Sequence, residues 1–131
     1  MPYTEVSETD DHPYPVARRS GDLVAVSGRL GVDEAGVLVP GGFEAECARA
    51  FANLDEALRS VGATRADVVQ VVVYLTDVTD RDRLNVAYGN FFDRPRPARS
   101  CVGVAALPYG ACVEIEALAH LRTSAGATDA V

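Results

Sequence analysis

The segment from Val68 to Leu75 constrains the fold of this chain most, because it is apolar at nearly every position. A strand with one face in water alternates apolar and polar residues, whereas a strand that is apolar on both sides is covered on both. The chain offers two helices, which cover one face of a sheet. The second face then needs cover from outside the chain, which predicts a homo-oligomer packed sheet face to sheet face. The alternative is that Val68, Val72 and Tyr74 lie partly at an exposed strand end.

Two other segments have the spacing of amphipathic helices. In residues 42–61 apolar side chains recur at intervals of three and four, and Gly62 follows as a stop signal. The stripe expected to pack inward is Phe43, Cys47, Ala50, Phe51, Leu54, Leu58 and Val61. In residues 79–92 we expect Thr79 to be the N-cap, and prolines end the pattern. The inner stripe of this second helix is Leu84, Tyr88 and Phe91.

Strands are expected around these helices, over residues 23–28, 66–76, 100–104 and 112–121. We expect residues 1–12 to form a polar lead-in or an edge strand, and the glycine-rich residues 31–42 to form a hairpin or a long loop. Residues 122–131 are expected to be a frayed tail. With 131 residues, this order predicts one α+β domain, a mixed sheet with two helices on one face.

Charge and cysteine content exclude several classes of protein. The formal net charge is −7 and the basic residues are scattered, which disfavours a nucleic-acid partner. The first residues carry no signal-peptide pattern, and no apolar run approaches the length of a membrane span. Cys47, Cys101 and Cys112 are widely spaced, which argues against both a disulfide framework and a zinc site. We therefore expect a reduced, cytoplasmic protein with no metal.

Residues 96–102 and 113–117 hold the groups best suited to chemistry. Arg99 stands at the start of one expected strand, and Glu114 lies on the strand that follows it in the sequence. Arginine presents a fork of donors that fits a carboxylate bidentately, and glutamate can position or activate a water. An arginine and a glutamate are the minimum needed to act on a small amino- or keto-acid derivative.

Each candidate also has a purely structural interpretation. Arg99 alone would more often form a surface ion pair, and Glu114 and Glu116 alternate with apolar residues as on a solvated strand face. We favour Glu114 as functional and Glu116 as structural. Cys101 has no base near it in sequence, so a small buried hydrophobe is the better interpretation than a nucleophile. The remaining structural interpretations are a packed aromatic for Tyr14, backbone capping for Asn85 and a turn for Ser27-Gly28.

Taken together, an ordered set of short motifs resembles the Rid (YjgF-type) family of reactive-intermediate deaminases. The resemblance runs from about Tyr14 to Ala119 and is most specific in the Pro-Ala-Arg-Ser motif and the Glu-Ile-Glu strand that follows it. The matching elements are Pro13-Tyr14, Ser27-Gly28, Asn53-Leu54, Asn85 with Tyr88 and Phe91-Phe92, Pro97-Ala98-Arg99-Ser100 and Val113-Glu114-Ile115-Glu116-Ala117.

This resemblance implies a chorismate-mutase-like fold, a homotrimer, and active sites in the clefts between subunits. It also implies hydrolysis of small enamines and imines, such as 2-aminoacrylate and 2-iminobutyrate, to the 2-keto acid and ammonia without a cofactor. By the same resemblance, Arg99 binds the substrate carboxylate and Glu114 orients the attacking water. The family's other pocket positions correspond to Tyr14, Ser27, Asn85 and Cys101.

Two departures from the family pattern bear on the substrate. The chain has His12-Pro13-Tyr14 where the family usually has Gly-Pro-Tyr, and Ser27-Gly28-Arg29 where it usually has Ser-Gly-Gln. Arg29 either accepts a larger or doubly anionic substrate or points into solvent. The alternatives to a general deaminase are a hydrolase with a larger, pathway-specific substrate and a non-catalytic trimer that binds small carboxylates or acts as a holdase. A ribonuclease fits poorly, because the acidic chain lacks a phosphate track.

Overall fold

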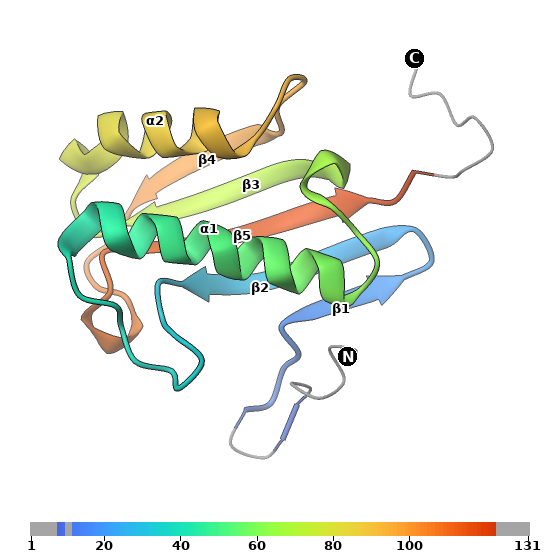
Figure 1. Ribbon diagram of the computed structural model, residues 1–131, viewed down its shortest axis with the longest axis horizontal. Helices are drawn as coiled ribbons and strands as arrows, with labels where there is room; N and C mark the ends of the chain where they lie inside the picture. Colours follow the sequence, from blue (N-terminus) through green and yellow to red (C-terminus); the bar gives the residue numbers. More distant parts are fainter. Residues whose placement is uncertain (1–7, 10–11, 123–131) are drawn as a thin grey trace.

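The computed structural model describes residues 8–9 and 12–122 (Figure 1). In this part of the chain two α-helices lie on one face of a five-stranded sheet. The strands are β1 (Ala17–Ser20), β2 (Leu23–Leu30), β3 (Val68–Leu75), β4 (Ala98–Gly103) and β5 (Val113–His120), and the helices are α1 (Gly42–Ser60) and α2 (Arg81–Phe91). The predicted α+β class, with both helices on one face, is confirmed.

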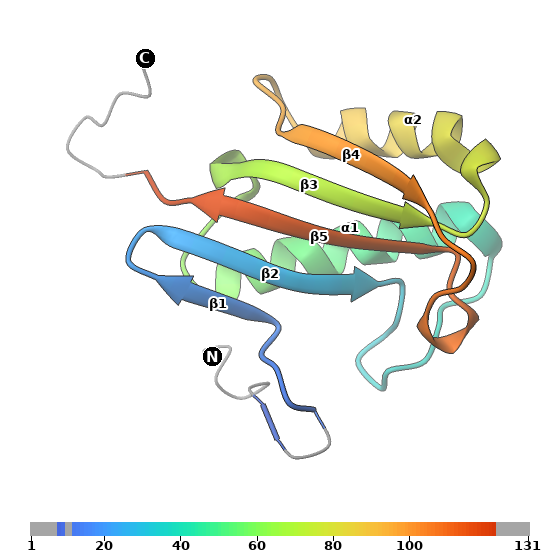
Figure 2. The same ribbon diagram turned by 180° about the vertical axis from the view of Figure 1, so that it is seen from behind.

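The sheet has the order β1-β2-β5-β3-β4. Only β3 and β4 pair in parallel, and α2 makes the crossover between them. The remaining pairs are antiparallel, so the sheet is mixed as predicted. Strand β5, the last in the sequence, therefore lies in the centre of the sheet between β2 and β3 (Figure 2). The order places Glu114 in the middle of the sheet and Arg99 on an edge strand.

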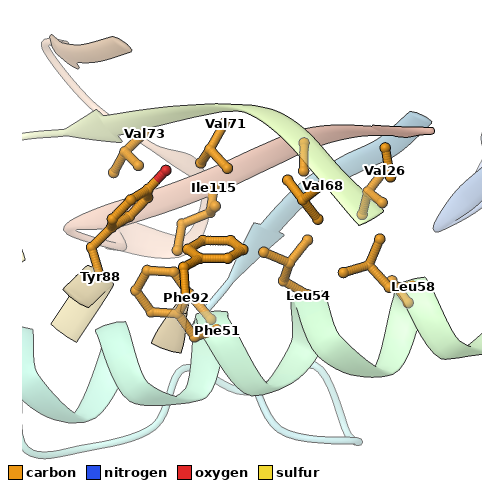
Figure 3. Close-up of a cluster of buried hydrophobic side chains, with 14 of the residues drawn as sticks. Val26, Phe51, Leu54, Leu58, Val68, Val71, Val73, Tyr88, Phe92 and Ile115 are labelled. Atoms are coloured by element: carbon orange, nitrogen blue, oxygen red, sulfur yellow. The ribbon is translucent and has the colours of Figure 1, made fainter. Parts of the chain in front are cut away.

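Helix α1 supplies much of the core. All seven residues of its predicted inner stripe are buried, and Figure 3 shows Phe51, Leu54 and Leu58 directed toward the strands. The helix lies close to the chain that leaves β2, since a Cβ added at Gly31 would lie 2.7 Å from the Cα of Glu46. Gly62 takes the left-handed conformation just beyond the helix, with φ 84°, which confirms the predicted stop.

The start of α2 differs from the expectation. Thr79 is not the N-cap of this helix, because a 3-10 turn over Val78–Asp80 precedes it and the helix begins at Arg81. The side chain of Asp77 accepts hydrogen bonds from both the backbone N–H (2.9 Å) and the hydroxyl (2.6 Å) of Thr79. An aspartate two residues earlier is thus the capping group, and the threonine is its donor.

One expectation for the N-terminal half needs correction, and another lies largely outside the described residues. Most of residues 1–12, expected to be a lead-in or an edge strand, and most of the tail are outside the described residues, and β1 (Ala17–Ser20) follows them at one edge of the sheet. Strand β2 continues past Gly28 to Leu30, with a bulge between Val26 and Arg29. In the loop that follows, Val32 and Leu38 form a single antiparallel bridge.

The second face of the sheet has no cover from the described part of the chain (Figure 2). Several apolar side chains of the strands are open to solvent there or at the sheet margins: Leu23, Val69, Val102 and Leu118. Val72 and Tyr74, which alternate with the buried residues of β3, are half-buried. The uncovered second face that the doubly apolar strand predicted is therefore present in the single chain.

Candidate active site

Arg99 lies on the face of the sheet that carries the helices. Its register partner on β3 is Val71, which is fully buried beneath the helices, and aligned residues of paired strands point to the same face. Nη2 of Arg99 donates a 2.7 Å hydrogen bond to Oδ1 of Asn85 on α2. The guanidinium also lies over the ring of Tyr88, 4.8 Å from its centroid. Two side chains of α2 thus orient Arg99 at the edge of the sheet.

Cys101 and Asn85 belong to the same group. Cys101 is aligned with buried Val73, two residues along β4 from Arg99, and is half-buried against the core. Asn85 is exposed, and its amide oxygen accepts from Arg99. Arg99, Asn85 and Cys101, which we name the arginine cluster, therefore come from β4 and α2.

Glu114 lies on the opposite face of the sheet. Along β5 the residues Val113, Ile115 and Ala117 are buried toward the helices, while Glu114 and Glu116 alternate with them and are half-buried. A Cβ added at Gly28 would lie 2.8 Å from Cδ of Glu114, closer than side-chain carbons approach. Glycine is therefore needed at position 28 to give the carboxylate room.

The Ser27-Gly28 pair forms the bulge of β2 rather than the turn that its sequence suggested. The positive-φ glycines of the described chain do not include Gly28, so close approach of Glu114 and not backbone freedom explains it. The hydroxyl of Ser27 donates to the carbonyl of Pro15 at 2.7 Å, and its backbone N–H donates to the carbonyl of Val16 at 2.9 Å. These bonds hold the segment that follows Tyr14 against the bulge.

Electrostatic interactions link the groups around the bulge. Burial raises the pKa of the Glu114 carboxyl, the neighbouring negative charge of Glu116 raises it further, and Arg29 opposes the rise. The Tyr74 hydroxyl donates to Oε1 of Glu116 at 2.8 Å, so Glu116 has a structural partner. Tyr14 is about half exposed and its ring stacks against His12 with centroids 4.5 Å apart. Glu114, Ser27, Gly28 and Tyr14 form a second group, which we name the glutamate cluster. Arg29 is aligned with buried Ile115 and so points to the face that carries the helices.

The two clusters do not meet within one chain. Strand β3 separates β4 from β5, so Arg99 and Glu114 are two strand spacings apart, about 10 Å. Register adds a further offset of about 10 Å along the strands, because Arg99 aligns through Val71 with Ala117, three residues from Glu114. The two side chains also point to opposite faces. Within the described chain the two clusters are therefore separate groups.

Sequence reasoning missed the contacts that orient the candidate groups. Tyr88 is expected in the inner stripe and, with Asn85, in a family motif, but its contact beneath the Arg99 guanidinium is not predicted by either. The position of Arg29 was left open, and the structure places it half-buried beside the bulge. The signal for the bulge is Gly28 itself, since a glycine in the interior of an apolar strand often marks one.

Other candidate sites in the described chain are weaker. No group of three His, Cys, Asp or Glu side chains there has the arrangement of a metal site. Burial raises the pKa of both the Cys47 and Cys112 thiols to about 12, and the Glu46 carboxylate contributes at Cys112. A groove of about 510 Å³ between α1 and α2 is lined by Phe51, Phe91 and Arg65 among others, and none of the residues of the two clusters lines it.

In the described part of the chain, neither α-helix is long and apolar enough to cross a membrane.

Comparison with known proteins places the chain among relatives of one kind. The family model described as endoribonuclease L-PSP, which covers the YjgF/RidA proteins, matches residues 7–121. The 2-iminobutanoate/2-iminopropanoate deaminase of Bos taurus is 42% identical over 108 residues, 82% of this chain and 79% of that protein. A RutC family protein of Pyrococcus abyssi is 34% identical over 119 residues, 90% of this chain and 94% of that protein.

A solved structure agrees with these sequence matches. The crystal structure of RidA from the Antarctic bacterium Psychrobacter sp. PAMC 21119 superposes with a TM-score of 0.81 at 36% identity, covering 88% of this chain and 94% of that one. The match includes both clusters, because the family model spans the chain from before Tyr14 to beyond Glu114. The chain therefore belongs to the Rid (YjgF-type) family of proteins.

Proposed function

We propose that this protein is a hydrolytic deaminase of small reactive 2-imino and 2-enamino acids, assembled as a homotrimer with its active sites between subunits. The observation that carries the proposal is the division of the candidate groups into two clusters on opposite faces of the sheet. An arginine cluster without a base binds a carboxylate but does no chemistry, and the glutamate cluster offers a base. Pairing one cluster with the other cluster of a neighbouring copy completes a site.

Uncovered apolar side chains on the sheet support the assembly. Leu118 on β5 and Val102 on β4 are 38% and 40% exposed in the single chain. Contact with a second copy would remove such surface from water and bring its Arg99 edge toward Glu114. The same face provides both the driving force for association and the cleft.

In the proposed mechanism Arg99 holds the substrate carboxylate with its guanidinium, kept in orientation by Asn85 and Tyr88. Glu114 accepts a proton from a water as that water attacks the imine carbon, and the carboxyl then returns this proton to the nitrogen. The resulting 2-amino-2-hydroxy acid then collapses to the 2-keto acid and ammonia, so one water is consumed for each C–N bond broken. An enamine enters the same route after proton transfer to carbon gives the imine.

The environment of Glu114 suits this role. A general base is most effective when its pKa lies near the working pH. Burial and the charge of Glu116 both raise the pKa of the Glu114 carboxyl, which brings it closer to neutral pH. An imine is already electrophilic, so orientation of the substrate and one water is sufficient.

The test is hydrolysis of 2-iminobutanoate, generated in solution by an amino-acid oxidase, with wild type and Arg99→Ala. We expect wild-type acceleration over the blank and a loss of about 100-fold in kcat/KM in Arg99→Ala, since a bidentate charged pair is lost. Arg81→Ala is the matched control, because Arg81 is an exposed arginine at the start of α2, and this variant should keep the wild-type rate. Equal rates for wild type and Arg99→Ala would refute the assignment.

A carboxylate-binding protein without turnover gives a different result. In that case 2-oxobutanoate binds in an Arg99-dependent manner while the imine decays at the blank rate. RNA cleavage by the purified protein is measured in parallel, because the matched family model is described as an endoribonuclease. RNA cleavage that disappears in Arg99→Ala would instead support a nuclease.

A further inference from the structure

Tyr74 is a half-buried polar side chain of the open sheet face that the proposed mechanism does not use. It lies on β3 directly opposite Glu114 on β5, and both residues alternate with neighbours that are buried toward the helices. Glu116 lies two residues further along β5 and shares this face. Strand register therefore places Tyr74, Glu114 and Glu116 side by side on the open face.

A hydrogen bond joins Tyr74 to the second of these carboxylates. The Tyr74 hydroxyl donates to Oε1 of Glu116 at 2.8 Å. Residues directly opposite on antiparallel strands have Cβ atoms about 5 Å apart, and the diagonal position, at about 7 to 8 Å, is still within reach of an aromatic side chain. The Tyr74 side chain therefore begins beside Glu114 and crosses to Glu116. The bond fixes where the Glu116 carboxylate lies relative to Glu114.

Several segments contribute titratable side chains around Glu114. They are Glu116 on β5, Tyr74 on β3, Arg29 on β2 and Tyr14 in the segment held against the bulge. Arg29 points to the opposite face, and its charge opposes the rise in the pKa of Glu114. The bond to Glu116 and burial both raise the pKa of the Tyr74 hydroxyl. Tyr74 therefore stays a neutral donor over the pH range in which a carboxyl titrates.

The direction of the Tyr74 bond distinguishes the two carboxyls. Residues two apart on a strand are separated by about 7 Å, so the charge of either carboxylate disfavours the charge of the other. A hydroxyl that donates to one carboxylate of such a pair stabilises its charged form and leaves the first proton to the other. Tyr74 donates to Glu116, which leaves that proton to Glu114.

We propose that Tyr74 is a positioning residue of the active site: its hydroxyl holds Glu116 as the charged partner, so that Glu114 is the carboxyl that takes the proton from water and returns it to the nitrogen. The proposal rests on the proposed function, which gives this proton transfer to Glu114. Tyr74 touches neither the substrate nor the water in this account and acts through Glu116.

The test follows the ionisation of Glu114 itself, by NMR of the intact protein labelled at its glutamate carboxyl carbons, with the signal assigned from Glu114→Gln. In Tyr74→Phe the ring stays and the bond to Glu116 is lost, so the midpoint of the Glu114 titration should move to lower pH. Glu116→Gln should move it further in the same direction. Tyr109→Phe makes the same change at a tyrosine that is 73% exposed, in the turn before β5, and should leave the midpoint unchanged.

The pH dependence of turnover gives a second readout. A base with a lower pKa is a weaker proton acceptor, so in mildly alkaline solution kcat of Tyr74→Phe should be about 2-fold below wild type. The acid decline should begin at a lower pH in the variant, so the two profiles should cross. A loss by the same factor at every pH would overturn the proposal, because Tyr74 would then only support the fold.

An unchanged Glu114 midpoint in Tyr74→Phe or in Glu116→Gln would overturn the proposal as well. The double variant shows whether Tyr74 acts through Glu116, because Tyr74→Phe should add no further shift in a Glu116→Gln background. An equal shift in that background would mean that Tyr74 acts on Glu114 directly. Absence of imine turnover in wild type refutes the proposed function, whereas the NMR titration still decides whether Tyr74 controls the ionisation of Glu114.

Discussion

Arg99 and Glu114 project from opposite faces of one sheet, with strand β3 between the strands that carry them. The helices cover the face of Arg99, and the described chain leaves the face of Glu114 open. A reaction that uses both groups therefore needs two copies of the chain. This geometry links the uncovered apolar face to the proposed chemistry, because one contact between copies would both cover that face and bring an Arg99 toward a Glu114.

Asn85 is expected to act through Arg99. Removing its amide in Asn85→Ala frees the guanidinium, and we expect kcat/KM to fall about 10-fold, mainly through a higher KM. Asn90→Ala is the matched control, since Asn90 is an exposed asparagine on the same helix. In an Arg99→Ala background Asn85→Ala should add nothing further. Additive losses would show that Asn85 works independently of Arg99.

Gly28 is expected to tolerate no side chain without moving Glu114. A methyl group at this position would lie 2.8 Å from Cδ of Glu114, so Gly28→Ala displaces the carboxylate. We predict a loss in kcat of at least about 10-fold, because catalysis depends on the position of the base. Gly89→Ala provides the comparison, since outside the backbone of its own helix the nearest neighbour of the added methyl group would be an Arg96 nitrogen at 3.7 Å. Unchanged kcat in Gly28→Ala would remove Glu114 from the mechanism.

The pH profile should report the ionisation of Glu114. Because the pKa of this carboxyl is raised above its ordinary value of 4.5, the base form is lost as the pH falls through the raised pKa. We expect the kcat/KM of wild type to decline on the acid side at a pH above 4.5. Glu114→Gln should lower kcat about 100-fold and flatten that decline. A decline that persists unchanged in the variant belongs to another group.

The contribution of Glu114 to the stability of the folded protein should fall as the pH rises, whereas activity should rise with the ionisation of this carboxyl. A carboxyl whose pKa is raised by folding binds protons more readily in the folded state, so its ionisation costs stability as the pH rises through that pKa. Glu114→Gln removes this cost, and the variant should melt at a higher temperature than wild type at pH 7. The difference should vanish below the ordinary pKa of 4.5, where both states of wild type are protonated. A variant that melts below wild type at neutral pH would contradict this account.

Association should depend on the open face of the sheet. Leu118→Asp places a charge on that face, which we expect to shift the protein to monomer in light scattering and to abolish turnover together with assembly. Val86→Asp, on the exposed side of α2, is the control that should stay associated. An active monomeric Leu118→Asp protein would rule out a shared cleft.

Periodicity was sufficient to predict the main elements of the fold. The inner stripe of α1 is buried at every predicted position, and the doubly apolar β3 is the strand whose second face lacks cover. Errors occurred where local polar groups compete with the regular pattern. The side chain of Asp77 accepts a hydrogen bond from Thr79 before α2 begins, so Thr79 is not the N-cap. The bulge allows β2 to continue past Gly28, which was expected to end the strand.

The candidate site was less accessible from sequence. Motifs supplied Arg99 and Glu114, but their separation by β3 depends on strand order, which hydrophobic periodicity does not encode. The contact between the Tyr88 ring and the Arg99 guanidinium was not predicted, because Tyr88 fits the apolar stripe of its helix. A turn was one interpretation of Ser27-Gly28, because a glycine that makes room for a distant carboxylate has the same sequence signal as one that bends the chain.

The most direct test of the shared site is complementation between two inactive variants. Arg99→Ala and Glu114→Gln are each expected to be nearly inactive, and the two chains are then coexpressed and purified as mixed oligomers. About one cleft in four should combine an intact Arg99 with an intact Glu114 from different chains, so roughly a quarter of wild-type activity should return. Activity that stays at the level of the separate variants, in oligomers shown to be mixed, would contradict an active site built from two copies.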